Sequence, residues 1–289
     1  MTLGIVCLVA TGFTWVTIGI IINSAARQGR NLAAIQFLAA LICVAVSLAV
    51  LAGTGAPLLR SPVVPFMLAA GIGNYATFQM MGRAMRSGPG GIVWGLIQSA
   101  LIFPFLMGMG FFDVSCTGKR ALGVLLILFS IAFFAKCRNA SRDGRGSGWF
   151  GWTLGAFLLA GFTQCMTNLP SYFPFGEASN VLKTLWVQIG TALAFLVEAW
   201  FRPQLRRTGN IWRPVLLLAL ASLVPQYFFF YRGLNAVAAH GAGSIGYPVA
   251  LGSCIIGFYL YSVIVLKERM TPLSAAAGCC GIAGIVLLC

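Results

Sequence analysis

Polar side chains without charge recur in the middle of long apolar segments of this chain. They are amides, hydroxyls and indole or phenol rings, whereas ionisable groups hardly occur there. An amide offers both a donor and an acceptor to a hydroxyl group, and an aromatic face packs against the C–H face of a sugar ring. Together these residue types predict a binding site for a neutral, hydroxyl-rich solute. The predicted substrate-binding residues are Trp15, Asn74, Tyr75, Gln98, Gln164, Asn168, Gln188, Gln226 and Tyr227.

The same residues have a second interpretation. A polar side chain inside a membrane needs either a partner or a cavity. Hydrogen bonds between membrane helices contribute about 0.6–2 kcal/mol each, so an isolated amide is as consistent with a bond between helices as with a ligand contact. The spread of these residues over many apolar segments favours one shared site.

Few ionisable side chains lie in or near the apolar segments. Lys183 is one turn inside its segment, from which a long basic side chain can extend to the membrane surface. Glu198 and Arg202 are four residues apart and are predicted to pair with each other. Asp113 and Glu268 are predicted to act as caps or turn partners. The candidates for a substrate charge or for proton coupling are Glu177, Lys183, Glu198, Arg232 and His240.

Membrane-spanning helices must position these residues. Of the 289 residues, 59% are hydrophobic and 8% are charged, whereas a soluble domain has about 25% charged residues. An apolar segment of about 20 residues is long enough to cross a bilayer. We therefore expect an all-α membrane protein with ten transmembrane helices, over 3–24, 31–53, 62–82, 90–110, 119–135, 149–169, 179–201, 212–232, 241–266 and 271–288.

Residues 88–134 and 241–288 are similar to each other. Each stretch opens on a glycine-rich tetrapeptide and continues as two apolar segments joined by a short polar turn. The two copies begin five predicted crossings apart, and an odd number of crossings inverts the second copy. We therefore predict two inverted five-helix repeats, 1–138 and 149–289, joined by a basic polar linker, 139–148. Inverted repeats are typical of transporters whose halves rock about a site at the membrane midplane.

Two aromatic residues, Trp94 and Tyr247, occupy matching positions in the two copies. Because their helices are predicted to run in opposite directions, we expect one aromatic side chain near each mouth of a shared cavity, where it can act as a gate. The alternative is that both rings pack in helix interfaces.

The basic residues predict the orientation of the chain. Fourteen of the 19 Lys and Arg residues fall in the odd-numbered turns. The positive-inside rule places these turns in the cytoplasm and both termini outside. The expected partners are a small polar solute and the lipid bilayer of the cytoplasmic (inner) membrane. The net charge of +14 accompanies no soluble basic module, so no nucleic acid is expected.

Small residues and cysteines have structural interpretations. Ala276, Cys280 and Gly284 recur at a spacing of four, which predicts close helix contact either within a monomer or in a homodimer. Most of the nine cysteines fall in apolar segments, where cysteine behaves as a small hydrophobic residue. Their spacing with the single histidine does not match a zinc site, and no metal is expected.

Three stretches resemble known transporters. The run from Leu266 to Leu273, followed by a Gly/Ala-rich helix, resembles the end of proteins in the drug/metabolite transporter superfamily (EamA-like). The runs 71–95 and 228–231 resemble the L-rhamnose–proton symporter branch more closely. The resemblance implies ten helices built as five plus five, alternating access, and a sugar or sugar-like cargo. The linker and the seventh turn are shorter here than in that symporter.

We therefore expect a secondary-active or facilitative transporter that moves a small polar metabolite, such as a deoxyhexose, by alternating access. The chain has no Gly-rich ATP-binding loop ending in Lys-Ser or Lys-Thr. One alternative is an exporter or carrier of amino acids, organic cations or amphipathic drugs, since aromatic faces attract cations. A non-transporting membrane sensor is another. An enzyme is not expected, because the acids and the single histidine form no nucleophile–base set. No cofactor is expected, while proton coupling stays open.

Overall fold

The computed structural model describes residues 2–53, 61–112, 117–140, 148–172, 179–206, 210–238, 246–268 and 271–287, and their regular secondary structure is entirely helical. The first half contains α1 (Thr2–Arg27), α2 (Leu32–Ala52), α3 (Val64–Ser87), α4 (Gly90–Gln98), η1 (Ser99–Leu101), α5 (Ile102–Phe111) and α6 (Gly118–Ala140). The second half contains α7 (Trp149–Asn168), η2 (Leu169–Tyr172), α8 (Asn180–Phe201), η3 (Pro203–Arg206), α9 (Trp212–Val224), η4 (Pro225–Phe230), α10 (Tyr231–Ala238), α11 (Gly246–Ile264) and α12 (Pro272–Leu287). The all-α prediction is confirmed.

Five helical segments of the described chain are long and apolar enough to cross a membrane. They are Thr2–Arg27, Leu32–Ala52, Gly90–Phe111, Asn180–Phe201 and Trp212–Phe230, and two shorter apolar helices accompany them. Large hydrophobic side chains also stay exposed on the outer surface of the bundle, among them Trp200 and Phe201. Because a soluble protein rarely exposes so much contiguous apolar surface, these features indicate a membrane protein.

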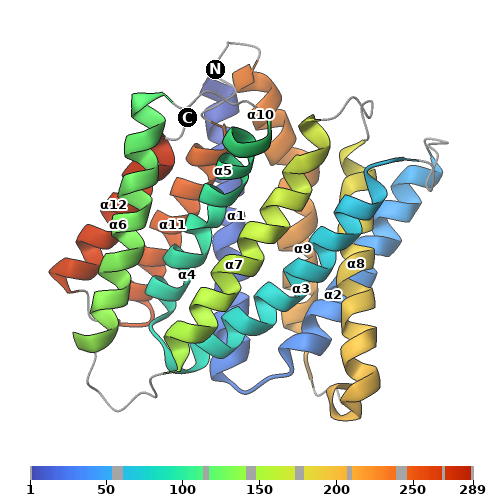
Figure 1. The fold of residues 1–289 in the computed structure, drawn as a ribbon. Coiled ribbons are helices and arrows are strands. Elements are labelled where there is room, and N and C mark those ends of the chain that lie inside the picture. The colour runs from blue at the N-terminus through green and yellow to red at the C-terminus, as the bar shows by residue number, and fades with distance from the viewer. Residues whose placement is uncertain are drawn as a thin grey trace.

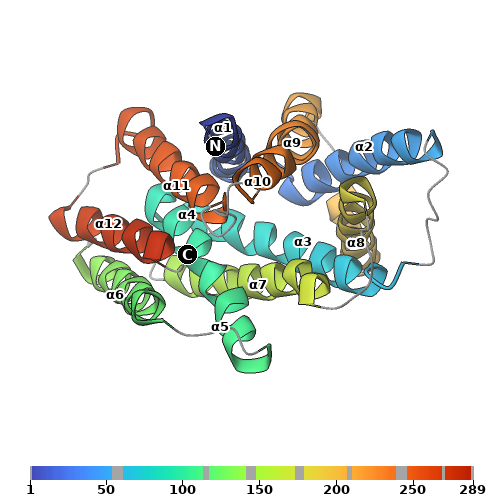
Figure 2. The same cartoon turned by 90° about the horizontal axis from the view of Figure 1, so that it is seen from above.

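The helices run back and forth between two ends of an elongated bundle (Figure 1). The turns that follow α1, α3, α8 and α11 lie toward the same, lower end in that view, and we call it the basic end because Arg27, Arg83, Arg202 and Lys267 belong to these turns or to the helix ends beside them. Seen from above, α6 and α12 lie at one side of the bundle and α2 and α8 at the other (Figure 2). The remaining helices pack between these two pairs.

Several helices begin with side-chain caps that their sequences supply. The Asn31 side chain accepts a hydrogen bond from Ala34 N at 3.1 Å and starts α2. Ser179 accepts one from Leu182 N at 3.2 Å and starts α8. Such caps satisfy backbone N–H groups that have no partner within the helix. They fix where the apolar segments begin and so set which side chains face inward.

Glycine allows the closest helix contacts. A Cβ atom on Gly71 of α3 would run into the backbone of α8 at Val187 O, and one on Gly190 of α8 would meet Leu68 O of α3. Small residues at such positions let two backbones approach closely in a membrane. The α3–α8 contact therefore depends on the glycines at 71 and 190.

The stripe predicted on the last helix is displaced around its axis. Gly284 packs against Ile127 and the Gly123 carbonyl of α6, and Gly281 lies near Ser130 of α6. Ala277 is buried with them, whereas Ala276 is exposed. Of the predicted residues, Gly284 lies on the contact face. That face consists of residues 277, 281 and 284 and packs against α6 of the same chain.

Two predicted spans are interrupted helices. The predicted span 90–110 divides into α4 and α5 at the 3₁₀ turn η1, and the predicted span 212–232 divides into α9 and α10 at the π-turn η4. Pro104 clashes with a regular helical carbonyl at residue 100, and Pro225 removes one backbone donor. Both prolines lie within continuous apolar segments, so hydropathy alone does not indicate the change of helix type. The breaks matter because Gln98 ends α4 and Gln226 lies inside η4.

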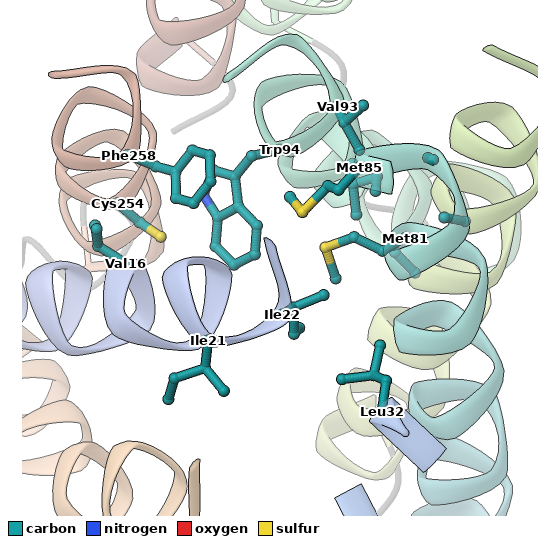
Figure 3. Close-up of a cluster of buried hydrophobic side chains, with 14 of the residues drawn as sticks. Val16, Ile21, Ile22, Leu32, Met81, Met85, Val93, Trp94, Cys254 and Phe258 are labelled. Carbon is teal, nitrogen blue, oxygen red and sulfur yellow. The ribbon is translucent and has the colours of Figure 1, made fainter. Parts of the chain in front are cut away.

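A buried hydrophobic cluster joins α1, α3, α4 and α11 near the basic end (Figure 3). Trp94 of α4 stacks on Phe258 of α11, with 5.1 Å between ring centroids. Met81 and Met85 of α3 fill the space beside the indole. Some members of this cluster, such as Met81 and Trp94, also line a cavity described next.

Candidate binding cavity

A cavity of about 530 Å³ lies between α1, α2, α3, α7, α8 and α9. Its size falls in the range of roughly 300–1,000 Å³ typical of small-molecule sites. Six of the predicted substrate-binding residues line it: Trp15, Asn74, Gln164, Asn168, Gln188 and Gln226. The structure therefore brings together amides from four helices, α3, α7, α8 and the broken α9–η4 segment.

A second cavity of about 230 Å³ adjoins the first and shares Trp15, Asn74, Gln164 and Asn168 with it. Gln98, another predicted site residue, lines this smaller cavity, and its Nε2 donates to Cys254 Sγ at 3.5 Å. Because they share these walls, the two cavities are neighbouring parts of one region. We call this region the central cavity.

Three polar atoms of residues that line the central cavity have no partner. Gln164 Oε1, Thr163 Oγ1 and Trp94 Nε1 are buried and form no hydrogen bond with the described residues. A buried polar group that lacks a partner costs roughly 1–3 kcal/mol. A ligand hydroxyl can donate to Gln164 Oε1, so this atom is a preformed hydrogen-bond acceptor for a polyhydroxylated molecule.

Trp15 supplies an aromatic side chain to the same cavity. Its indole packs against Phe230, with 5.4 Å between ring centroids and 49° between ring planes. Because the indole also lines both cavities, it presents apolar surface beside the amides. An aromatic wall next to hydrogen-bonding groups is the combination that a sugar ring needs.

Lys183 also lines the larger cavity. It is the only charged side chain among the described lining residues, and no hydrogen bond or ion pair engages its ammonium group in the described part of the chain. Lys183 was one of the predicted candidates for a substrate charge, and the extension of its side chain to the membrane surface stays a prediction. Its place in the first turn of α8 puts a positive charge at the cavity wall.

Two predicted site residues point elsewhere. Tyr75 is 4% exposed, and its hydroxyl donates to Glu198 Oε2 at 2.7 Å. The Tyr227 hydroxyl shares a hydrogen bond of 2.7 Å with Ser47 Oγ of α2. Neither tyrosine lines the central cavity. Each joins two helices, which is the alternative interpretation of polar residues in a membrane span.

Of the two predicted gating residues, the structure describes the side chain of Trp94 but not that of Tyr247. Trp94 is buried, stacks on Phe258 and lines the smaller cavity, so it both packs in a helix interface and reaches the cavity. Tyr247 lies in the first turn of α11, and its side chain falls outside the described part of the structure. Glu177 and His240 also lie outside the described residues, whereas Arg232 is exposed on α10.

Gln36 is a cavity residue that the sequence analysis missed. It lies one turn inside α2 and lines the larger cavity. Its Nε2 donates to Asn74 O at 3.4 Å, and its Oε1 accepts from Gln79 Nε2 at 3.0 Å. The available signal was a lone amide in an apolar helix. Its nearness to the helix end made it resemble a surface residue.

Charged hydrogen bonds close the basic end below the cavity. Glu268 pairs with Arg27, at 2.6 Å from Oε1 to Nη2, and its carboxylate accepts from Gly90 N at 2.8 Å and from Gly91 N at 3.1 Å. A carboxylate is favourable at a helix N-terminus, so Glu268 caps α4 from the turn between α11 and α12. The prediction that Glu268 is a cap is confirmed. The predicted pair of Glu198 and Arg202 is also present, at 3.0 Å.

Comparison with known proteins supports the fold and gives no information about the function. The chain matches no family model and no curated protein. A crystal structure of a protein is similar over 97% of this chain and 94% of its own, with a TM-score of 0.61 and 14% identity. At this identity the similarity shows the fold alone. The class that the coordinates define is an all-helical membrane protein with a central polar cavity.

Proposed function

We propose that this chain is a carrier that moves a small, hydroxyl-rich metabolite across the membrane by alternating access. The observation that carries the proposal is the central cavity, where amides from α2, α3, α4, α7, α8 and η4 meet an indole and Gln164 Oε1 has no partner among the described residues. In the proposed cycle the cargo's hydroxyl groups satisfy these amides. Binding shifts the equilibrium between conformations only through its different affinity for each.

Helix packing supports the proposal of ten crossings in two inverted repeats. If α4–η1–α5 and α9–η4–α10 each count as one crossing, every helix of 1–138 has a counterpart five crossings later. The packing of α3 against α7 then corresponds to that of α9 and α10 against α1, and α1 against α11 corresponds to α7 against α4 and α5. The π-helical segment η4 at the site adds support, because π-turns inside α-helices occur frequently at functional sites.

Two contacts at the basic end define what must move. Glu268 ties α1, α4 and the turn between α11 and α12 together, and Tyr75 with Glu198 ties α3 to α8. In the proposed cycle the described conformation is closed at this end, and these contacts break when the cavity opens there. The positive-inside rule assigns the basic end to the cytoplasm.

Lys183 favours a cargo that carries one negative group beside its hydroxyls. The described lining residues contain no acid to balance the ammonium charge. A hydroxy acid, such as a sugar acid, places a carboxylate against Lys183 and its hydroxyls against the amides. A neutral sugar leaves that ammonium group to water alone.

Uptake by the purified protein in liposomes tests the proposal. A panel of labelled neutral sugars, sugar acids, amino acids and organic cations is offered with and without a pH gradient. We expect uptake of a hydroxyl-rich member, with a lower rate for Gln164→Ala and an unchanged rate for Gln28→Ala, an exposed amide remote from the cavity. Saturable binding without uptake, for any member of the panel, would instead indicate a sensor. Acceleration by an inward proton gradient would establish proton coupling.

A further inference from the structure

We propose that a pocket at the basic end, separate from the central cavity, binds a phosphate group. The pocket has a volume of about 300 Å³ and lies between the turn after α1, the end of α3 and the end of α8. Its charged lining residues are Arg30, Arg83, Arg86, Arg202 and Glu198. We call it the arginine pocket. It lies outside the central cavity, and its assignment does not depend on the transport proposal.

The positive charge of the arginine pocket is only partly balanced. Glu198 is its single described acid, and that carboxylate already accepts from Arg202 at 3.0 Å and from the Tyr75 hydroxyl at 2.7 Å. Arg30 and Arg86 are exposed, and no hydrogen bond or ion pair within the described chain engages either guanidinium group. Like charges that converge without a counterion are unfavourable, so the pocket favours an anion.

Two of the arginines are held in place. Arg202 is fixed by Glu198, and the Arg83 guanidinium lies 4.7 Å from the centroid of the Trp152 ring, which is a cation–π contact. Asn31 is fixed as well, because its Nδ2 donates to Leu205 O at 2.7 Å. The pocket is therefore formed before any ligand arrives. Less ordering of the protein is then needed on binding.

The chemistry of the pocket fits phosphate. A guanidinium group matches phosphate oxygens with two parallel N–H donors, and several arginines from different helices can surround one phosphate. Basic pockets between membrane helices on the cytoplasmic side bind anionic lipid headgroups. The phosphate can thus come from an anionic lipid or from solution. The two sources differ in whether acyl chains are attached.

The test compares two phosphate sources in the wild-type protein, in one double variant and in one control variant, each as the full chain. The probes are phosphatidylglycerol in neutral detergent micelles and inorganic phosphate in solution, each read as a shift in the melting temperature and, for the lipid, as lipid retained in native mass spectrometry. The main variant is Arg30→Gln/Arg86→Gln, which leaves the two fixed arginines in place. The control is Arg213→Gln, which removes an exposed charge at the beginning of α9, at the same end of the bundle but outside the pocket.

We expect the double variant to bind the effective probe at least about tenfold more weakly than the wild type, because each arginine near an anionic surface contributes measurably to binding. The control should bind as the wild type does. A shift with the lipid alone identifies a headgroup site, and equal shifts with both probes identify a site for soluble phosphate. If the double variant does not fold, Arg86→Gln alone provides the same comparison. Equal binding by wild type and Arg30→Gln/Arg86→Gln, or an equal loss in Arg213→Gln, would overturn the proposal.

Discussion

The central cavity and the arginine pocket are both polar spaces between helices, but they differ in how their polar groups are satisfied. The central cavity has amides and hydroxyls, one ammonium group, and three buried atoms without a partner among the described residues. The arginine pocket concentrates charge, and its one described acid is engaged by two partners. A charge deep in a membrane is costly, whereas charge near the headgroups is not. The proposed topology, with the central cavity in the membrane interior and the arginine pocket near the headgroups, is consistent with this difference.

A thin layer of hydrogen bonds separates the two spaces. Gln36 and Gln79 form one part of it, and Tyr75 with Glu198 forms the other. Gln36 lines the central cavity, while Gln79 and Glu198 line the arginine pocket. Substitutions of Glu268 and Tyr75, which do not line the central cavity, should therefore change stability without removing a ligand contact. Substitutions of the unpartnered cavity atoms should do the reverse.

The largest loss of stability is expected for Glu268→Ala. The carboxylate accepts two backbone N–H bonds and pairs with Arg27, and each hydrogen bond to a charged group contributes roughly 1.5–3 kcal/mol. We expect the free energy of unfolding in detergent to fall by roughly 3 kcal/mol. Denaturant titration followed by circular dichroism measures this loss.

Glu268→Gln is the matched control, because an amide oxygen still accepts from one N–H while the charge is lost. It should fall between Glu268→Ala and the wild type. Cargo affinity should change less in both variants than it does in Gln164→Leu, since Glu268 does not line the central cavity. A wild-type unfolding midpoint for Glu268→Ala would show that the contacts at Gly90 and Gly91 carry no stability.

Tyr75→Phe tests whether the separating layer is structural. The substitution removes the hydroxyl that donates to Glu198 and leaves the ring that packs edge-on against Phe195. The free energy of unfolding should fall by about 1.5 kcal/mol, the low end for a bond to a charged group. Isothermal titration with the transported solute should give a smaller change in Kd than Gln164→Leu gives, because Tyr75 does not line the central cavity. A higher Kd, with the free energy of unfolding unchanged, would instead indicate that Tyr75 contacts the solute.

Gln164→Leu should give the opposite result. Gln164 Oε1 is buried without a partner, so replacing the amide by an apolar group of similar size should leave the free energy of unfolding unchanged or higher. The affinity for the transported solute should fall about tenfold, equivalent to the loss of about 1.4 kcal/mol of binding. Titration and thermal unfolding of the same preparation measure both effects. A loss of stability with unchanged affinity would make Gln164 a packing residue.

Neighbours in sequence show how far the cavity could be predicted. Asn74 and Tyr75 are adjacent polar residues in the same apolar helix, yet only Asn74 lines the cavity. Consecutive residues of a helix point to different faces, and the stripe of apolar residues in α3 is too broad to tell which face meets a cavity. The choice between ligand contact and helix contact required the positions of α2 and α8.

Long-range contacts explain the remaining differences. The prediction of an all-helical chain rested on local hydropathy and was confirmed, whereas the breaks near Pro104 and Pro225 required the prolines to be weighed against that hydropathy. Glu268 was predicted to be a cap, but no local pattern indicates that it caps a helix 178 residues earlier in the chain. The place of Lys183 among the cavity-lining residues could not be derived from hydropathy for the same reason, because a cavity wall forms only when distant helices meet.

Tyr227→Phe should have the smallest effect and sharpens the contrast with Tyr75. Its hydroxyl bonds to the neutral Ser47 hydroxyl at 2.7 Å, and bonds of this kind between membrane helices average about 0.6 kcal/mol. We expect a loss of about 0.6 kcal/mol in the free energy of unfolding, less than half of that for Tyr75→Phe. A double-mutant cycle with Ser47→Ala isolates the bond, because both single variants should lose it and the double variant should lose no more. An effect as large as that of Tyr75→Phe would mean that the charge on Glu198 does not set the difference between the two tyrosines.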